Sequence, residues 1–518
     1  MVLVQRTIKL KKTAKTNFCP YFYGFVPLIG CIFGVNFVLC HLVNKPVIMI
    51  QNRWTKYIRS LVLGLSVLFF PLLVIGQNRP NIIVILSDDG GYEDFGCYGG
   101  TDVHTPHIDH LAQQGVLFRS AYATASVCAP SRAGLLTGRY QQRFGFEHNI
   151  SKLPAEGVKM EDIGMDVSVK TIGDQLRYNG YKTIAIGKWH QGDYEPYFPL
   201  NRGFDHFFGF IGGHRSYFGI ERQKVNDEYV LYDDRKVVSE REITYLTEDL
   251  TNKALGYIDR YKSEPFFIYL SYNAVHTPME ATYRSYQKYA HVTDTLRRTY
   301  LAMLDDMDTG IGRIVDRLKQ QGLYENTMIF FLNDNGAATN NGADNGILRG
   351  LKGSKWEGGI RVPLIMQWPK HLPAGVQSAS LVSTMDILPT CIALAGGKIL
   401  PDQKIDGKNL LESYRSPEKG HAELFWRRGV AKAVRHKDWK MIAVDTQPVL
   451  LFDLSTDQTE QTNVAAEHPE VCQRLLSDLA KWEEEMQDPK WFSPYGDYNQ
   501  LMKHRMEVVG REMERLYP

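Results

Sequence analysis

The sequence predicts an α/β protein in which a mainly parallel central sheet is flanked by helices, followed by a smaller C-terminal domain with an antiparallel sheet and a helix. Three observations predict this class. Short apolar runs recur with helical segments between them, which is the pattern of parallel βαβ units. These runs do not alternate apolar and polar residues. The composition changes after about Leu411, where Pro417, Gly420 and several charges follow.

The apolar runs are the expected strands of the central sheet. Each is short and rich in Ile, Val and Phe, as expected for strands that are buried on both faces. The expected strands are Asn81 to Ser87, Thr183 to Gly187, Pro265 to Ser271, Thr327 to Asn333 and Val362 to Trp368. The expected helices are Thr105 to Gln114, Val169 to Asn179, Thr244 to Tyr261, Thr293 to Gln321 and Asp386 to Ala395.

The smaller domain has its own pattern of shorter elements. We expect strands at Gly429 to Arg435, Trp439 to Val444 and Val449 to Leu454, then a helix from Pro469 to about Met486. The chain therefore divides into a large α/β domain at residues 77–411 and a smaller α+β domain at residues 412–518.

The chain begins with a basic, apolar leader, which carries nine Lys or Arg and no Asp or Glu in its first 76 residues. Basic residues from Arg53 to Arg59 precede an uncharged run from Leu61 to Ile75, the layout of a secretory signal peptide at residues 49–76. A membrane anchor is the alternative, but a run of ~15 residues is short for the ~20 that span a bilayer. We expect a bacterial protein that is exported, periplasmic or secreted, with no stable membrane partner.

A second apolar run, Tyr21 to Val43, lies upstream and is unusual in front of a signal peptide. Met49 is therefore a candidate translation start, with residues 1–48 as a misassigned extension. An additional membrane segment is the alternative.

Charge and cysteine content exclude two classes of protein. Without the first 76 residues the formal charge changes from +2 to −7, with 51 basic against 58 acidic residues. Nucleic-acid binding needs a clustered positive field, so we expect no nucleic-acid partner. Three of the seven cysteines fall in the leader, and the four that remain do not form a disulfide scaffold; they are Cys97, Cys128, Cys391 and Cys472.

Acidic and amide residues follow two of the expected strands. Asp88 and Asp89 come directly after the first strand, and Asp334 and Asn335 follow another. Ligands of parallel α/β sheets gather at the carboxyl ends of strands. Three carboxylates and an amide suit a hard divalent cation, calcium more readily than zinc. The alternative is turn chemistry, since both sequences are ordinary turn formers.

The segment Ser126-Val127-Cys128-Ala129-Pro130-Ser131-Arg132 places one cysteine in a setting that suits neither a disulfide nor zinc. One interpretation is a buried cysteine at a helix start, with Pro130 in the first turn and Ser131 as a cap. The segment also resembles the active-site signature of the type I sulfatases, of the alkaline phosphatase superfamily. A second stretch, Gly180 to His190, resembles that family's other signature, and two long matches argue against coincidence.

The resemblance implies a nucleophile and a metal site. In that family a maturation enzyme oxidises the cysteine to formylglycine (3-oxoalanine), whose hydrated aldehyde attacks a sulfate ester. Cys128 would be its precursor. The resemblance also implies that calcium is held by this group together with Asp88, Asp89, Asp334 and Asn335.

The resemblance further implies the roles of five other residues. Arg132 would supply fixed positive charge near the nucleophile and the metal, and Lys188 would do so on the sulfate oxygens. His190 would take a proton in the second step. His276 and Lys352 would contact the sulfate and help the leaving oxygen depart.

These assignments have structural alternatives. Lys188 and His190 are otherwise a solvent-facing pair at a strand end, and Lys352 a lysine of a surface loop. Lys355 lies in the same glycine-flanked loop and could take the place of Lys352.

The substrate is read from weaker signals. His214 and Arg215 are candidate substrate-binding residues, and the Phe425-Trp426 pair with Arg427-Arg428 also suits a sugar pocket, because aromatic faces stack on sugars and Arg binds anions. We expect a carbohydrate sulfatase that acts on a sulfated oligosaccharide of an algal or host polysaccharide. The alternatives are a phosphodiesterase or phosphonate hydrolase of the same superfamily and an inactive glycan-binding homologue.

Overall fold

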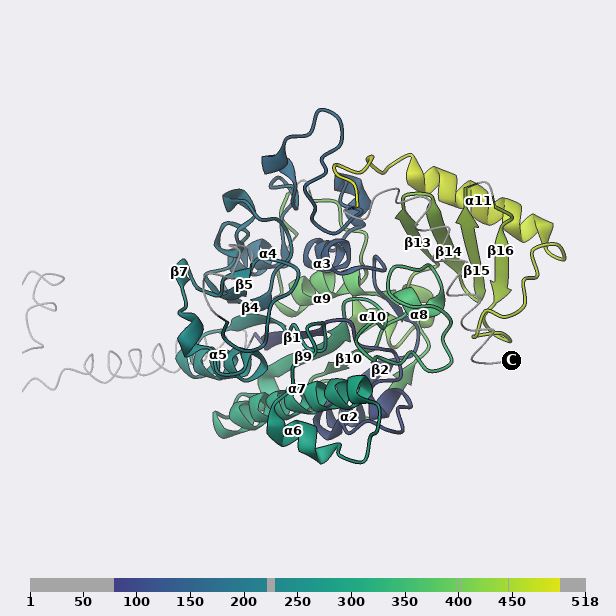
Figure 1. Cartoon of the computed structure of the whole chain (residues 1–518). Helices are drawn as coiled ribbons and strands as arrows, with labels where there is room; N and C mark the ends of the chain where they lie inside the picture. Colours follow the sequence, from purple (N-terminus) through teal and green to yellow (C-terminus); the bar gives the residue numbers. More distant parts are fainter. Residues whose placement is uncertain (1–78, 221–228, 398, 402, 446, 494–518) are drawn as a thin grey trace, which may run out of the picture. The chain divides into compact units, whose positions relative to one another are not determined.

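The structure is a computed structural model that describes residues 79–493, apart from 221–228, 398, 402 and 446 (Figure 1). The expected extension at 1–48 and signal peptide at 49–76 lie outside the described residues. All described residues belong to one compact unit. Among them, no helix combines the length and the hydropathy needed to traverse a bilayer.

A ten-stranded sheet lies at the centre, in the order β11-β2-β10-β9-β1-β8-β4-β5-β6-β7. A separate pair of short strands, β3 (Ala121–Tyr122) and β12 (Val382–Ser383), lies beside it. The strands of the large sheet are β1 (Asn81–Ser87), β2 (Val116–Phe118), β4 (Lys182–Lys188), β5 (His206–Phe210), β6 (Tyr232–Asp233), β7 (Lys236–Val237), β8 (Phe266–Ser271), β9 (Thr327–Asn333), β10 (Leu364–Gln367) and β11 (Val376–Ser378).

The middle of the sheet is parallel and wholly buried, as the non-alternating runs predicted. β1 pairs in parallel with β8 and β9, so that Val84 lies between Tyr269 and Phe330. Every residue of these three strands is buried. β10 runs antiparallel to both β9 and β2, and β6 runs antiparallel to β5. The fold class is therefore confirmed as mainly parallel, with antiparallel strands toward both edges.

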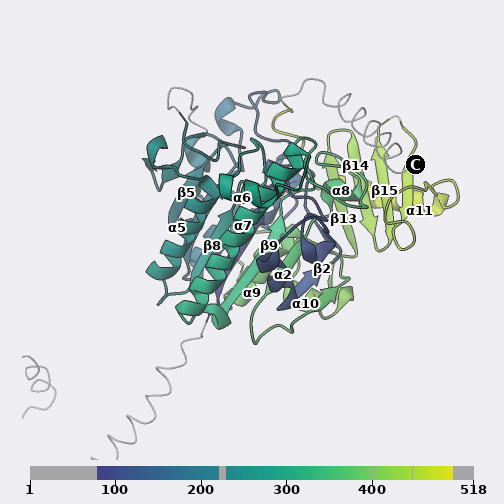
Figure 2. The same cartoon turned by 60° about the horizontal axis from the view of Figure 1, so that its bottom comes forward.

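Helices cover both faces of the sheet (Figures 1 and 2). One layer consists of α2 (Pro106–Gln113), α5 (Leu246–Arg260), α6 (Tyr283–Lys288) and α7 (Thr295–Gln320). The other consists of α3 (Cys128–Thr137), α4 (Ile172–Tyr178), α9 (Ile387–Leu394) and α10 (Leu410–Ser413). Each layer buries its own apolar cluster against the sheet, which holds the strand ends in fixed positions.

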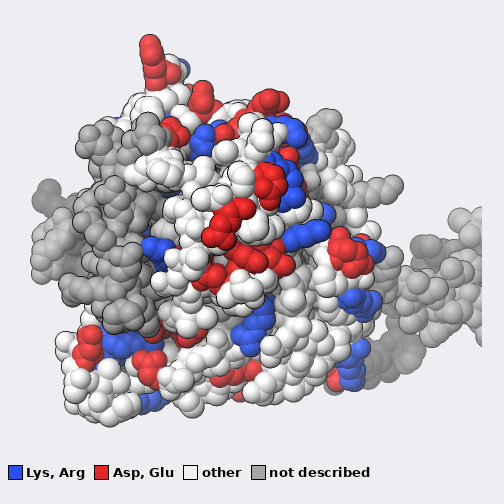
Figure 3. Space-filling model, turned by 90° about the vertical axis from the view of Figure 1, so that its right-hand side faces the viewer, with Lys and Arg blue, Asp and Glu red and all other residues white. Residues whose placement is uncertain are grey.

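The C-terminal part is an antiparallel sheet with one helix, as predicted, and the sheet is a meander of four strands rather than three. Its strands are β13 (Glu423–Arg428), β14 (Ala431–His436), β15 (Trp439–Val444) and β16 (Leu450–Asp453), and α11 (Pro469–Glu483) packs against them. Strand β13 was not predicted. Charges of both signs are interspersed on the face shown in Figure 3.

Specific contacts join this meander to the large domain, at β3 and at one short helix. The Trp426 indole N–H donates a hydrogen bond of 2.8 Å to the carbonyl of Ala123, and its ring lies 5.4 Å from that of Tyr122. The short helix α8 (Glu357–Ile360) provides a second junction, because the Lys440 Nζ atom lies 2.8 Å from the Glu357 carboxylate. The loop before α8 carries Lys352, so the meander contacts the chain segment that reaches the candidate site.

Candidate active site

The two acidic pairs meet at one edge of the sheet. Strands β1 and β9 are parallel and in register to their last residues, so that Ser87 lies opposite Asn333 and the residues that follow both strands emerge side by side. The side-chain amide of Asn335 donates to Asp89 Oδ1 at 2.7 Å, and the Asp89 amide N–H donates to Asp334 Oδ1 at 3.3 Å. Asp88, Asp89 and Asp334 are at most 2% exposed. Turn residues are usually solvated, so this burial argues against turn formation as the sole role of these residues.

Helix α3 places the cysteine against this cluster. The helix begins at Cys128, and all ten of its residues are buried. Val127 is the N-cap residue, so the interpretation of Ser131 as a cap is wrong: the Ser131 hydroxyl reaches across to donate to the carbonyl of Asp334 at 2.5 Å. The Cys128 Sγ atom lies 4.0 Å from Asp89 Oδ1.

Arg132 lies one turn after the cysteine and binds two of the carboxylates. Its Nε donates to Asp334 Oδ2 at 2.9 Å, and its other donors contact Asp88 and the hydroxyl of Ser271. The guanidinium is fully buried, a position that a charge tolerates only when it is paired and hydrogen-bonded. Arg132 therefore brings fixed positive charge to the site.

Lys188 and His190 follow from the end of β4, and the solvent-facing interpretation of this pair is wrong. The Lys188 Nζ atom lies 2.6 Å from Asp88 Oδ2, and both residues are buried. Burial, together with the charge of Lys188, lowers the pKa of His190 well below its usual range. The ring is consequently neutral.

Two residues of the site have backbone conformations that are rare outside glycine. Asp89 has a φ of 62° and His190 a φ of 56°, both in the left-handed region that L-residues with a Cβ seldom adopt. Such conformations persist where surrounding contacts impose them, commonly at functional sites. Asp89 and His190 each lie two residues after the end of a strand, β1 and β4 respectively, and both strands belong to the large sheet.

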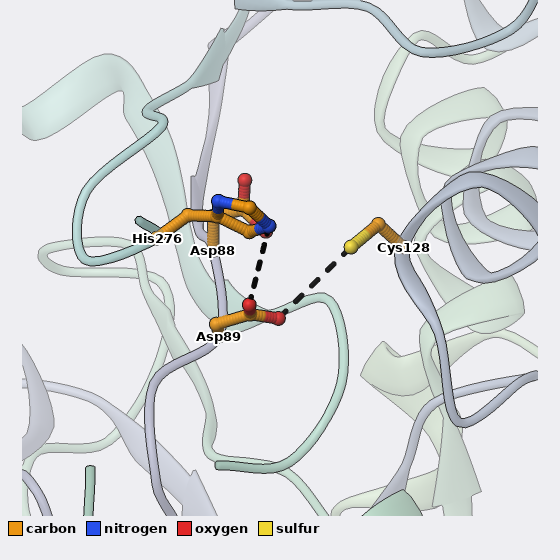
Figure 4. Close-up of side chains that lie close together, drawn as sticks. All are labelled: Asp88, Asp89, Cys128 and His276. Atoms are coloured by element: carbon orange, nitrogen blue, oxygen red, sulfur yellow. Dashed lines mark hydrogen bonds and ion pairs between the residues drawn. The ribbon is translucent and has the colours of Figure 1, made fainter. Parts of the chain in front are cut away.

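His276 enters from the loop after β8. Its Nε2 atom lies 3.4 Å from Asp89 Oδ2, and its Nδ1–H donates to the carbonyl of Thr277 at 2.7 Å. Burial alone would lower the pKa of His276, but the carboxylates of Asp89 and Asp88 raise it. Figure 4 shows Asp89 between His276 and Cys128, with a contact to each.

The loop lysine that reaches the cysteine is Lys352. Its Nζ atom lies 2.9 Å from Cys128 Sγ and 2.6 Å from Asp89 Oδ1. Lys355 is also buried, but its amine points to the hydroxyl of Ser126 at 3.4 Å. The structure thus brings Lys352, and not Lys355, to the thiol.

The electrostatics of this cluster act on the thiol. Burial alone would raise the pKa of Cys128, but the nearby ammonium groups of Lys188 and Lys352 lower it to about 7. A strongly perturbed group among fixed charges is a common mark of a functional site. The four cysteines among the described residues are all free thiols, so none is held in a disulfide.

The donor atoms at this point fit a hard cation. One ligand atom each from Asp88, Asp89, Cys128 and His276 lie within 4.8 Å of one another. Within the described structure, Asp88 Oδ1 and Asn335 Oδ1 are buried and accept no hydrogen bond. Carboxylate and amide oxygens are the donors that calcium prefers. His276 is therefore an additional candidate beside the metal ligands that were predicted from the sequence. The carboxylate of Asp334, one of those predicted ligands, contacts Arg132.

The cluster opens into a cavity of about 400 Å³. His214 lies at its mouth, exposed, with its ring centre 6.1 Å from that of His276. Arg215 does not line this cavity: it is buried, and its guanidinium donates to Glu240 and to the carbonyls of Tyr229 and Ser216.

The aromatic pair on β13 does not face the cavity either. Phe425 stacks on Trp482 of α11, and Trp426 is buried against Tyr122 of β3. Sequence reasoning also missed Asn149, a cavity residue whose side-chain oxygen accepts the amide N–H of Ala129 at 3.0 Å. It lies in an irregular loop 20 residues after Ala129, where the sequence carries no motif.

Comparison with known proteins agrees with this geometry. The sulfatase family model matches residues 80–397, more than half of the chain. The chain belongs to the sulfatase family. A second model, described as N-sulphoglucosamine sulphohydrolase, C-terminal, matches residues 352–485. These matches identify a type I sulfatase of the alkaline phosphatase superfamily, and hence a sulfuric ester hydrolase, as the sequence predicted.

Named relatives cover most of the chain. The N-acetylgalactosamine-6-sulfatase of Mus musculus is 34% identical over 72% of this chain and 73% of its own length. Arylsulfatase J of Mus musculus is 29% identical over 79% of this chain and 76% of its own. The crystal structure of Ps i-CgsB superposes with a TM-score of 0.75 at 34% identity and covers 85% of this chain and all of that one.

Proposed function

We propose that this sulfatase is exported and removes sulfate from a carbohydrate, using formylglycine made from Cys128 and a bound calcium. Two relatives support a carbohydrate substrate: one is named N-acetylgalactosamine-6-sulfatase, and the other, Ps i-CgsB, was crystallised with the oligosaccharide k-i-k-neocarrahexaose. The His, Tyr and Arg side chains that line the cavity are of the kinds that bind sugar hydroxyls and anions. The basic, apolar leader supports export.

The observation that carries the proposal is the convergence on Cys128. Its sulfur atom lies beside the Lys352 amine and 4.0 Å from Asp89, at the base of the cavity. Conversion to formylglycine supplies a hydrate with one hydroxyl that attacks sulfur and a second whose deprotonation lets sulfate leave. An unmodified thiolate, which the lysines also favour because, against the effect of burial, they lower the pKa of Cys128 to about 7, would have no second hydroxyl whose deprotonation could expel sulfate.

The surrounding side chains have complementary tasks. Lys352 and His276 lie next to the reacting position, where they donate to the ester oxygen that departs with the carbohydrate. Lys188 adds fixed positive charge that stabilises the sulfate oxygens in the transition state, and Arg132 orients the carboxylates behind it. His190 is neutral because burial lowers its pKa, which is the state that accepts a proton from the remaining hydroxyl.

A bound calcium supplies charge neutralisation for sulfate and orients the nucleophile. The residues that would hold it are Asp88, Asp89 and Asn335, whose buried oxygens include the two that accept no hydrogen bond in the described structure. Asp334 would support this set through its contact with the Asp89 amide.

The test is a mass measurement joined to an activity assay. The protein is produced with a formylglycine-generating enzyme, and the tryptic peptide that ends at Arg132 is weighed. Sulfate release is then measured from 4-nitrophenyl sulfate, N-acetylgalactosamine 6-sulfate and k-i-k-neocarrahexaose, with Cys128→Ala as the control. We expect formylglycine in the peptide and release from a sugar that Cys128→Ala abolishes. Unmodified cysteine in active protein, or activity confined to the aryl ester, would contradict the proposal.

A further inference from the structure

Strand β13 of the C-terminal meander sends alternate side chains to opposite faces. Leu424, Trp426 and Arg428 are buried on one face, and the residues between them are half-buried on the other. Trp426 identifies the first face as the one against the large domain, because its indole N–H bonds to Ala123, directly after β3. Arg428, two residues further on, therefore also faces the large domain.

Arg428 reaches the cavity of the active site. It lines the same cavity as Cys128, Lys352 and His276, and it is 5% exposed. Within the described residues it is the one side chain of the four-stranded meander that lines this cavity. A rigid antiparallel pairing with Ala431 of β14 fixes its backbone, so its position does not depend on a loose loop.

The positive charge on this wall of the cavity comes from Arg428 itself. His148, a neighbouring basic group outside the cavity lining, is neutral near pH 7, because burial and then the charge of Arg428 lower its pKa to about 3. The adjacent carboxylate, Glu147, is engaged by Arg427 through a hydrogen bond of 2.6 Å and by the amide of Gly429. The electrostatic potential on this side therefore favours a negative ligand.

We propose that Arg428 is a specificity-determining residue that binds a second oxyanion of the substrate, a sulfate or carboxylate other than the sulfate that is hydrolysed. This inference rests on the proposed carbohydrate sulfatase function. The planar guanidinium binds either oxyanion through paired N–H donors. A singly charged sulfate ester has no group to place there, so Arg428 separates multiply charged sugars from simple ones.

The experiment uses three sugars and one reporter. N-acetylgalactosamine 6-sulfate, its 4,6-disulfate, and the disaccharide of glucuronate and N-acetylgalactosamine 6-sulfate are measured as substrates by sulfate release, or as competitive inhibitors of 4-nitrophenyl sulfate hydrolysis. We expect the wild-type enzyme to bind at least one doubly charged sugar about tenfold or more tightly than the monosulfate. The two doubly charged sugars distinguish a second sulfate from a carboxylate.

The decisive variant is Arg428→Gln, with Arg428→Lys as the conservative change. Arg428→Gln is expected to weaken the favoured sugar by about 10- to 100-fold in KM or Ki, with kcat/KM on 4-nitrophenyl sulfate changed less than about threefold. Arg428→Lys should restore part of the preference, because a point charge remains. Lys432→Gln removes one charge from the same meander on the side of α11, where Lys432 contacts Glu483, and should leave the preference intact.

The possible results separate the role of Arg428 from the carbohydrate sulfatase function. Equal losses on the reporter and on every sugar would show a structural role for Arg428, and a wild-type enzyme without preference for a doubly charged sugar would also overturn the inference. If the wild-type enzyme releases sulfate from the reporter but from no sugar and is inhibited by none, the carbohydrate function itself fails. Melting temperatures of all variants verify that they are folded.

Discussion

At the residue scale, Lys352 and Lys355 lie three positions apart in one loop, yet their amines contact different groups. Lys352 is 16% exposed and reaches Asp89 and Cys128, whereas Lys355 is fully buried and its amine contacts the hydroxyl of Ser126. One amine therefore contacts the Cys128 thiol, and the other contacts Ser126, two residues before it.

A pair of substitutions separates these two tasks. Lys352→Met should lower kcat/KM for sulfate-ester hydrolysis by about 10²- to 10³-fold, because it removes a fixed charge from the reacting position. Lys355→Met should keep the rate within about tenfold of wild type. Initial rates on 4-nitrophenyl sulfate measure both, and the mass of the Cys128 peptide verifies that formylglycine is present in each variant. Similar losses in the two variants would contradict the assignment.

The second lysine should also appear in the pH dependence of stability. Burial, with the charges of Arg428 and Lys440, lowers the pKa of Lys355 to about 7, so between pH 7 and about 10.5 the unfolded chain binds more protons than the folded one. Stability from this group therefore rises with pH. Lys355→Met should be more stable than wild type at pH 7 by on the order of 3–5 kcal/mol, and the gap should narrow toward pH 10. Urea unfolding at pH 7, 8.5 and 9.5 measures it; a gap that is constant with pH would contradict the explanation.

At the element scale, helix α3 buries Cys128, the residue that the proposed function requires to be modified. All ten of its residues are buried, and Cys128 is 1% exposed. An enzyme that oxidises this cysteine cannot reach it while α3 is packed in this way. Folding and modification therefore compete for the same segment.

This competition predicts when the modification takes place. Folded protein made without the maturation enzyme should remain unconverted after the enzyme is added. The same protein, unfolded in denaturant and then diluted into buffer that contains the enzyme, should be converted while it refolds. A peptide of residues 120–138 should also be converted. Peptide mass spectrometry over a time course measures the conversion. Efficient conversion of the folded protein would show that α3 opens readily, contrary to its burial.

The sequence predicts long buried elements better than short ones. The strands at Asn81 and Thr327 were predicted to the residue, because a wholly apolar run has distinct ends. β2 and β11 have three residues each, too few for a periodic signal, and owe their existence to the sheet beside them. β13 was missed because it contains Trp426, Arg427 and Arg428, whose amphipathic side chains resemble a binding surface until the packing of both faces is known.

In the candidate site, too, some positions follow from the sequence and others depend on how the chain packs. Asp88, Asp89, Asp334 and Asn335 were predictable because they directly follow strands, and parallel strands bring their carboxyl ends together. His276 was placed at the site only through the family resemblance, and the burial of Arg215 was not predicted, because both depend on how loops fold back over the sheet. Choosing between Lys352 and Lys355 likewise required the path of a loop, which no local pattern encodes.

The carboxyl ends of β1 and β9 give a prediction about metal removal. Chelation with EGTA should lower both the melting temperature and the activity, because a ligand present at 100 times its Kd stabilises the folded state by about 2.7 kcal/mol. Added calcium should restore both. Asn335→Ala loses one of the buried oxygens and should respond much less to chelation in the melting temperature, measured by scanning fluorimetry. An unchanged melting temperature in wild type would contradict a calcium site.

At the scale of the whole molecule, a buried ion pair joins the C-terminal meander to helix α8 of the large domain. Lys440 lies 2.8 Å from Glu357 and 3.1 Å from Glu460, and all three side chains have no exposed surface. Glu357 also accepts the hydroxyl of Tyr122 at 2.5 Å. Because Glu357 follows Lys352 by five residues, the meander helps to hold the loop that carries Lys352.

Removing the shared cation should therefore destabilise the junction. Lys440→Met leaves two buried carboxylates without it and should cost about 3–5 kcal/mol of unfolding free energy, the usual result of breaking a buried pair. The double variant Lys440→Met/Glu460→Gln should recover about half of that loss in unfolding free energy, because the uncompensated charge of Glu460 is removed. Urea unfolding measures both, and kcat/KM on 4-nitrophenyl sulfate reports how far the Lys352 loop moves.

The pH dependence distinguishes this electrostatic cost from lost packing. Burial and the neighbouring Glu357 raise the pKa of Glu460 to about 7, above its value in the unfolded chain. A raised pKa of this kind means that protonation favours the folded state, and that this advantage is lost as pH rises through 7. Without Lys440 the pKa of Glu460 should rise further, so the penalty of Lys440→Met should be smaller at pH 6 than at pH 8. A penalty that is equal at both values would assign the loss to packing of the lysine stem, since a methylene chain does not titrate.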